Sequence, residues 1–230
     1  MSDPAQAKWT KLVLRPAAAR GFAADSIPIF RSTYRDPRGK VRSWEHAERV
    51  TRPKSSTVDG LMWVDSGPEI VLQKQYRPPL DAVVIEVPAG LVDEGESAED
   101  AAVRELKEET GYIGVISEST PVMFNGNSIL PRPSCFTRRT STEHAQFPDP
   151  GFCNTNLKMV HVTIDMTKPE NQHPAPQLEE NEFIDVFTLP IKELYAACRK
   201  WEAEGYAIDA RVGSLAEGIE CARTLNLFSK

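Results

Sequence analysis

Short runs of strand-favouring residues recur along this chain, and in residues 159–166 apolar and polar residues alternate with the period of two that is typical of β-strands. The runs that predict strands are residues 11–14, 27–34, 40–50, 58–64, 69–76, 82–87, 159–166 and 183–189. Three other segments place apolar residues on one face of a helix. They lie between Ser97 and Gly111, after Pro190, and after Asp209. Strands interleaved with three helices predict an α/β fold, as an α/β/α sandwich with a mixed sheet.

The first part of the chain is a separate and more polar region of this pattern. Asp36-Pro37-Arg38-Gly39 is a β-turn signal between two of the predicted strands. A lone hairpin is marginal in water, so we expect it to pair with another sheet or another subunit. The sequence therefore predicts a small N-terminal antiparallel β subdomain in residues 1–56 and a main domain in residues 57–230.

Composition narrows the classes of function. The chain has 230 residues, of which 40% are hydrophobic and 26% charged, and its net charge of −6 argues against a nucleic acid polymer as partner. No run of about 18 apolar residues predicts a membrane span, and residues 1–10 lack the pattern of a signal peptide. The four cysteines form no Cys-x-x-Cys pair, so neither a zinc site nor a disulfide framework is indicated. We expect a cytoplasmic protein, with the nucleus as an alternative.

Six carboxylates crowd the predicted helix that ends at Gly111. They are Glu96, Glu99, Asp100, Glu105, Glu108 and Glu109. Glu105 and Glu109 are one helical turn apart and project from the same side, with Glu108 at the edge of that side. Like charges at this spacing cost an isolated helix roughly 0.2–0.5 kcal/mol per pair, whereas clustered carboxylate oxygens suit Mg²⁺. The spacing leaves two interpretations, a solvated acidic face or a metal site.

The order of residues around this helix resembles the Nudix box of Nudix hydrolases. Every fixed glycine and polar position of the box is filled, by Gly90, Glu96, Arg104, Glu105, Glu108, Glu109 and Gly111, with Leu106 between them. Tyr112 departs from the general pattern, which has an aliphatic residue there. The resemblance implies a loop–helix–loop that binds a divalent metal and hydrolyses a nucleoside diphosphate linked to another group.

The segments Gln75–Pro79 and Glu86–Gly90 narrow this resemblance to ADP-ribose and ADP-sugar pyrophosphatases, and the likeness runs from about Trp9 to Arg223. It implies cleavage of ADP-ribose to AMP and ribose 5-phosphate, with Mg²⁺ or alternatively Mn²⁺ as the metal. It also implies a nucleoside diphosphate sugar as the substrate and a homodimer whose N-terminal segments cross to the partner subunit.

The same resemblance implies roles for individual residues. The expected metal ligands are the carbonyl of Ala89 and the side chains of Glu105, Glu108 and Glu109. The expected catalytic residues are Glu182, Glu108 and Arg104. Glu182 matches the position of the general base, and Glu179 and Glu180 are close enough to replace it. The expected substrate contacts are Trp9, Trp44, Glu45, Arg49, Arg77 and Asp149. The two tryptophans would stack on adenine, and the alternative for each is a place in the core.

Two stretches show no clear periodicity. Residues 167–181 are polar and contain Pro169, Pro174 and Pro176, which suggests a mobile lid. Residues 124–147 form an atypical insertion, because the resembling enzymes have almost no connection there. Three explanations remain open for it: a tolerated surface loop, a lid that changes the group accepted, or an intron left in frame.

Two other functions also remain open at this point. One is a Nudix pyrophosphatase for another nucleotide, such as an oxidised nucleoside diphosphate. The other is a catalytically silent nucleotide-binding sensor, which the intact metal positions of the box argue against.

Overall fold

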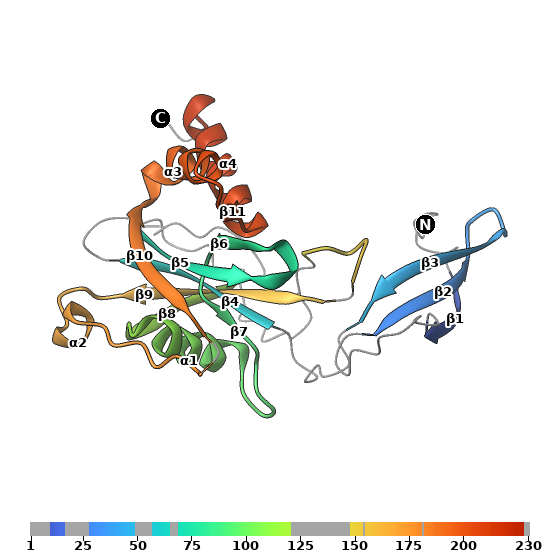
Figure 1. The fold of residues 1–230 in the computed structure, drawn as a ribbon, viewed down its shortest axis with the longest axis horizontal. Coiled ribbons are helices and arrows are strands. Elements are labelled where there is room, and N and C mark those ends of the chain that lie inside the picture. The colour runs from blue at the N-terminus through green and yellow to red at the C-terminus, as the bar shows by residue number, and fades with distance from the viewer. Residues whose placement is uncertain are drawn as a thin grey trace, which may run out of the picture.

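The computed structural model describes residues 10–16, 28–48, 57–64, 69–120, 148–153, 155–180 and 182–227, and Figure 1 shows their arrangement. The strands are β1 (Thr10–Pro16), β2 (Ile29–Arg35), β3 (Val41–Ala47), β4 (Thr57–Val64), β5 (Glu69–Arg77), β6 (Ala82–Glu86), β7 (Ala89–Gly90), β8 (Gly114–Thr120), β9 (Leu157–Ile164), β10 (Ile184–Pro190) and β11 (Ala207–Ile208). The helices are α1 (Ala98–Thr110), α2 (Pro169–Gln172), α3 (Leu194–Ala203) and α4 (Ala210–Thr224), with 3₁₀ turns at Pro78–Leu80 and Ile191–Glu193. Within these ranges, no helix combines the length and the hydropathy needed to cross a bilayer.

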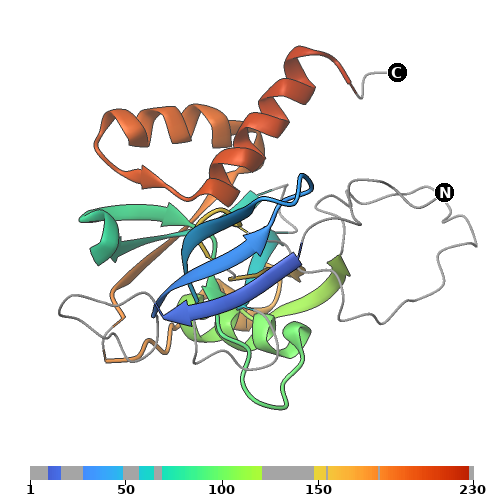
Figure 2. The ribbon, with the colours of Figure 1, turned by 90° about the vertical axis from the view of Figure 1, so that its right-hand side faces the viewer.

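The strands form two sheets. Strands β1, β2 and β3 make a small antiparallel sheet near the N-terminus, and Figure 2 shows these three blue strands side by side. The larger sheet has eight strands in the order β11-β6-β5-β4-β9-β8, with β10 paired to β5 and β7 paired to β4. Its β4–β9 and β11–β6 pairs are parallel and the others are antiparallel. The predicted mixed sheet and the small N-terminal antiparallel sheet are both confirmed.

Helix α1 packs on one face of the large sheet, and α3 and α4 pack on the other (Figure 1). Alternation along β5 supplies both cores, because Val71 packs under α1 whereas Ile70 and Leu72 pack under α3 and α4. Strand β9 divides in the same way, with Val160 in the first core and Met159 in the second. Both faces of these strands are therefore buried, and the predicted α/β/α sandwich is confirmed.

Both ends of α1 follow the capping signals of the sequence. The Ser97 hydroxyl accepts a hydrogen bond from the Asp100 amide at 3.0 Å, which makes Ser97 the N-cap. Gly111 has a φ of +76°, and its amide donates to the Lys107 carbonyl at 2.9 Å. A Cβ at position 111 would also lie 2.3 Å from the backbone nitrogen of Ala175. Glycine is required there for conformation and for space, so the last turn of α1 has a fixed end.

Several elements differ from the sequence prediction. Strand β8 is not predicted, because a register shift between Ile116 and Glu118 breaks the alternation in this edge strand. Helix α3 begins only at Leu194, since a 3₁₀ turn follows Pro190. The short helix α2 lies inside the stretch interpreted as a lid. The insertion 124–147 and the end of the N-terminal region, residues 49–56, lie outside the described residues.

Candidate active site

Glu109, on the last turn of α1, is buried against the large sheet with an exposed fraction of 4%. Its Oε2 accepts a hydrogen bond from the Ala89 amide at 2.9 Å, and its Oε1 lies 3.4 Å from the side-chain nitrogen of Gln73 on β5. Burial raises the pKa of Glu109 to about 8, and the negative charges of Glu105 and Glu182 act in the same direction. A nearby cation would favour the ionised form of this carboxyl group.

Glu105 lies one turn earlier on the same side of α1 and packs against Gly90. A Cβ at position 90 would lie 1.7 Å from the Cδ atom of Glu105, so no side chain fits there. Burial raises the pKa of Glu105, the hydrogen bond from Arg104 lowers it, and the charges of Glu108 and Glu182 raise it. The absent side chain of Gly90 therefore provides the space in which the Glu105 carboxylate lies beside β7.

Arg104 holds the loop before α1 onto the helix. Its guanidinium donates to both carboxylate oxygens of Glu96, at 3.0 and 2.9 Å, and to the Leu91 carbonyl at 2.8 Å. Its Nη1 donates to Glu105 at 2.9 Å and to Glu108 at 3.1 Å. These carboxylates, Glu96 above all, raise the pKa of Arg104, so it stays a cation. In the structure Arg104 organises this loop, and the catalytic role expected for it stays a prediction.

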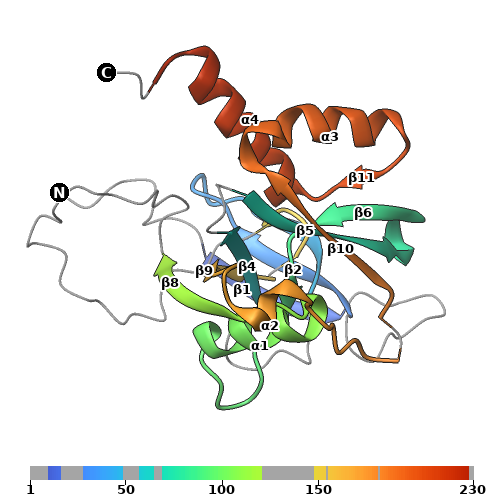
Figure 3. The same ribbon diagram turned by 90° about the vertical axis from the view of Figure 1, so that its left-hand side faces the viewer.

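Glu182 lies between α2 and β10, on a segment that passes beside α1 (Figure 3). Its Oε2 accepts a hydrogen bond from the Glu179 amide at 3.0 Å, and its own amide donates to the Glu179 carbonyl at 3.0 Å. The negative charge of Glu182 contributes to the raised pKa of both Glu105 and Glu109. Glu179 and Glu180 are exposed, whereas Glu182 is half-buried. This placement favours Glu182 over its two neighbours as a base acting beside α1.

These acidic residues fit a divalent ion in their chemistry, although their side chains alone do not enclose one. Within the described ranges, no three Asp, Glu, His or Cys side chains are gathered closely enough to hold a metal. Mg²⁺ usually takes few protein ligands and completes its shell with water and substrate phosphates. Glu109, with its buried carboxyl group, and Glu105, in the space beside Gly90, supply oxygens of the right kind. The residues present therefore fit a divalent metal ion, and the ligand roles of Ala89, Glu105, Glu108 and Glu109 stay predictions.

Arg77, at the end of β5, is held by Glu86 at the end of β6. Nε of Arg77 donates to one oxygen of Glu86 at 3.2 Å, and Nη2 lies 2.7 Å from the other oxygen. Burial raises the pKa of Glu86, and the hydrogen bond from Arg77 lowers it. The Arg77 side chain is nevertheless 41% exposed. Glu86 lies opposite Gln73 in the sheet, so Arg77 and Glu109 are tied to neighbouring positions on one sheet face.

The role of Glu86 in holding Arg77 is not evident from the sequence, because it depends on the place of Glu86 opposite Gln73. The pairing of the two residues depends on the register of β5 and β6, which a single strand pattern does not reveal. The available signal is the place of a carboxylate in an otherwise apolar strand, Ala82–Glu86, directly before Gly90. A buried carboxylate in such a strand requires a cationic partner, and Arg77 is that partner here.

Trp44, on β3, is 53% exposed and is fixed by the turn that contains Asp149. Its indole Nε1 donates to the Gly151 carbonyl at 2.8 Å, and the Ala47 amide on the same strand donates to the Phe152 carbonyl at 2.8 Å. Asp149 closes the turn by accepting a hydrogen bond from the Phe152 amide at 3.2 Å. The structure therefore brings Trp44 and Asp149 together, and the exposed ring of Trp44 is not a core residue.

The other expected substrate contacts have different outcomes. Glu45 forms an ion pair with Arg31 across strands β2 and β3, and both side chains are exposed. Trp9 and Arg49 lie outside the described residues. The substrate roles of all these residues stay predictions.

Comparison with known proteins bears on the whole site. The family model of the NUDIX domain matches residues 53–211. The chain belongs to the Nudix family. An ADP-ribose pyrophosphatase of Saccharomyces cerevisiae is 44% identical over 208 residues, which cover 87% of this chain and 80% of that protein. An ADP-sugar pyrophosphatase of Mus musculus is 33% identical over 193 residues, which cover 81% of this chain and 78% of that protein.

A solved structure shares the fold of this Nudix chain. The crystal structure of an ADP compounds hydrolase superposes with a TM-score of 0.56 at 16% sequence identity, covering 95% of this chain and 96% of the other. At this identity the likeness concerns the fold, and it agrees with the two layers of helices around the mixed sheet.

The close approach of Gly90 and Glu105 yields a testable prediction. Gly90→Ala places a methyl group against the Glu105 carboxylate, so we expect Mn²⁺ binding to weaken by about tenfold or more. Electron paramagnetic resonance of free Mn²⁺ measures the affinity, and circular dichroism checks the fold. Gly218→Ala is the matched control, because a Cβ there meets nothing within 4 Å. Equal Mn²⁺ affinities in the two variants would contradict this placement of Glu105.

Proposed function

We propose that this Nudix hydrolase cleaves the diphosphate bond of ADP-ribose and related ADP-sugars, releasing AMP and, from ADP-ribose, ribose 5-phosphate. The observation that carries the proposal is the convergence of Glu105, Glu109 and Glu182 in a chain 44% identical to a relative named ADP-ribose pyrophosphatase. The carboxylates suit chemistry at a diphosphate, and the relative points to the nucleotide.

The positions of the carboxylates suggest a role for each of them in the proposed reaction. The Ala89 carbonyl, Glu105 and Glu109 would hold Mg²⁺, or Mn²⁺ in its place, with Glu108 at the edge. Such an ion neutralises phosphate oxygens whose negative charge repels an incoming nucleophile. Glu182 would accept the proton of the attacking water.

Two arginines have further roles in this scheme, Arg104 toward other side chains and Arg77 toward the substrate. Arg104 would keep Glu105 and the loop before α1 in place through its hydrogen bonds. Arg77 would bind a phosphate through charge-assisted hydrogen bonds. Its two contacts with Glu86 use part of its five N–H donors and fix the plane of the guanidinium, which leaves donors for substrate.

The proposed nucleobase site is formed by Trp44 and Trp9, whose rings would stack on adenine, with Glu45, Arg49 and Asp149 as polar contacts. The exposed Trp44 ring supports this assignment, because its hydrogen bond to Gly151 holds it outward.

We also propose a homodimer in which the N-terminal segments are exchanged. The small sheet supports it, because a sheet of three strands needs a hydrophobic face or a packing partner to be stable. The sheet also exposes the large apolar side chains of Ile29, Val41 and Trp44. The cytoplasmic location expected from the sequence stays a prediction.

A substrate panel with Mg²⁺ tests the proposed function. We expect AMP to appear from ADP-ribose much faster than product appears from an oxidised nucleoside diphosphate. Glu109→Gln should lower kcat by about a hundredfold or more while the protein stays folded, because it removes a charged oxygen from the site. Faster turnover of the oxidised nucleotide would indicate another Nudix pyrophosphatase. Tight binding of ADP-ribose without product would indicate a sensor.

A second prediction concerns Trp44. Stacking on a base contributes on the order of 1–3 kcal/mol to binding and acts alike on the ground and transition states. Trp44→Ala should therefore raise KM for ADP-ribose by about tenfold and leave kcat within about twofold. Trp44→Phe keeps an aromatic face but loses the hydrogen bond to Gly151. Its KM should therefore lie between those of the wild type and Trp44→Ala. A loss confined to kcat would refute the stacking role.

A further inference from the structure

The segment that carries Glu182 begins at a fully buried asparagine. Asn171, in α2, has an exposed fraction of 0%. Its Oδ1 accepts a hydrogen bond from the Ile113 amide at 2.8 Å. Its Nδ2 donates to the carbonyls of Ile113 and Asp165, both at 2.9 Å. Both amide hydrogens are thus used, and one side chain joins α2 to the residue before β8 and to the end of β9.

A second contact ties the following residues to α1. The Gln177 amide donates to the Glu108 carbonyl at 2.7 Å. This carbonyl belongs to the last turn of the helix, where no later helical amide is available to it. Ala175 lies directly over Gly111, because a Cβ on that glycine would be 2.3 Å from the Ala175 nitrogen. We call residues 173–180 and 182 the strap. Its residues Ala175 and Gln177 rest on the end of α1, the turn that carries Glu109.

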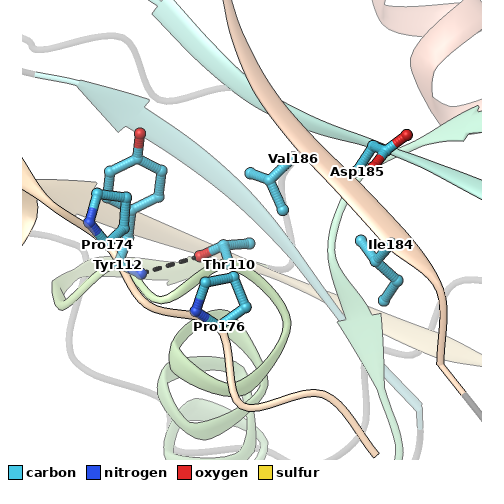
Figure 4. A pocket seen from close by; sticks show the side chains of 7 residues that line it. All are labelled: Thr110, Tyr112, Pro174, Pro176, Ile184, Asp185 and Val186. Atoms are coloured by element: carbon cyan, nitrogen blue, oxygen red, sulfur yellow. Dashed lines mark hydrogen bonds between the residues drawn. The ribbon is translucent and has the colours of Figure 1, made fainter.

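Hydrogen bonds tie the strap to its neighbours, and a cavity lies beside its two prolines. A cavity of about 270 Å³ separates Pro174 and Pro176 of the strap from Ile184 and Val186 of β10. Figure 4 shows the two prolines on one side of this space and the β10 side chains on the other. The contacts that locate the strap before β10 are those of Asn171, of Gln177 and of Ala175 over Gly111. After Glu182 the chain enters β10, where Ile184 pairs with Gln75 of β5.

Residues between Gln177 and Glu182 are themselves held by hydrogen bonds. Glu179 and Glu182 form a turn through two hydrogen bonds. The Glu179 amide donates to the Glu182 carboxylate, and the Glu182 amide donates to the Glu179 carbonyl. Gln177 is the last anchor before Glu182, and its acceptor, the Glu108 carbonyl, lies on the same helix as Glu105 and Glu109. The anchor at Gln177 and the turn at Glu179 therefore help to set the distance between the carboxylate of Glu182 and those of Glu105 and Glu109.

We propose that Asn171 and the backbone amide of Gln177 form a latch that positions Glu182 against the carboxylates of α1. Both are positioning residues, since neither needs to touch substrate. The proposal rests on the proposed function in one respect, because it takes Glu182 as the base. In this proposal the stretch whose sequence suggested a mobile lid is instead held at two points, Asn171 and Gln177.

A matched pair of variants tests the second anchor. Gln177→Pro removes the amide that bonds to Glu108, whereas Gln177→Ala shortens the same exposed side chain and keeps the amide. We expect kcat for ADP-ribose to fall about 10- to 100-fold in Gln177→Pro, because a displacement of about 1 Å costs that much. KM and Mn²⁺ affinity should stay within about threefold. Gln177→Ala should resemble the wild type.

A double-mutant cycle shows whether the latch acts through Glu182. In a Glu182→Gln background, Gln177→Pro should have almost no further effect on kcat, because the group that it misplaces is already gone. Additive effects, or equal kcat values in Gln177→Pro and Gln177→Ala, would overturn the proposal. Asn171→Ala provides the same test at the first anchor if the proline variant does not fold.

Hydrogen exchange separates a failure of the latch from a failure of the proposed function. Amides of residues 178–182 should exchange faster in Gln177→Pro than in Gln177→Ala, whatever the substrate of the enzyme. Equal exchange in the two variants would overturn the latch. A wild-type protein that fails to hydrolyse ADP-ribose, but shows this difference in exchange, would overturn the proposed function and leave the latch standing.

Discussion

The burial of the Glu109 carboxyl group against the amide of Ala89 is the contact on which the rest of the site depends. It joins the last turn of α1 to strand β7, which pairs with β4, and so fixes the helix against the large sheet. Taking a carboxylate out of water is unfavourable unless it is paired, and the raised pKa of Glu109 reflects that cost. A cation beside Glu109 would offset this cost. The same carboxyl group therefore connects α1 to β7 and favours a positive charge next to it.

The residues around the Glu109–Ala89 contact determine where charged side chains lie. Gly90 leaves room for the Glu105 carboxylate. Arg104 draws the preceding loop onto the helix and offsets part of the acidic charge. On the sheet side, the Glu86 carboxylate holds Arg77 with its guanidinium partly exposed. Negative side chains are thus gathered at the end of α1, and the guanidinium of Arg77 lies partly exposed at the end of β5.

The sequence predicts those parts of this site that depend on local chemistry. The caps at Ser97 and Gly111 define α1, and helical spacing places Glu105 and Glu109 on one side of it. The remaining parts depend on contacts between distant residues. Asn171 meets Ile113 from 58 positions away, and Trp44 meets Gly151 from 107 positions away. No local pattern encodes these pairs, because they arise only when the sheet and its loops are assembled.

Mg²⁺ binding to Glu109 can be followed directly through its proton. A carboxyl group with a pKa of about 8 is mostly protonated at pH 7, and it must lose that proton to bind a metal. Isothermal titration calorimetry in buffers of different ionisation enthalpy measures this release. We expect close to one proton per Mg²⁺ near pH 7, an affinity that rises up to about pH 8 and then levels off, and no such release in Glu109→Gln. An equal Mg²⁺ affinity in Glu109→Gln, with the same proton release as the wild type, would contradict a role for Glu109 as a metal ligand.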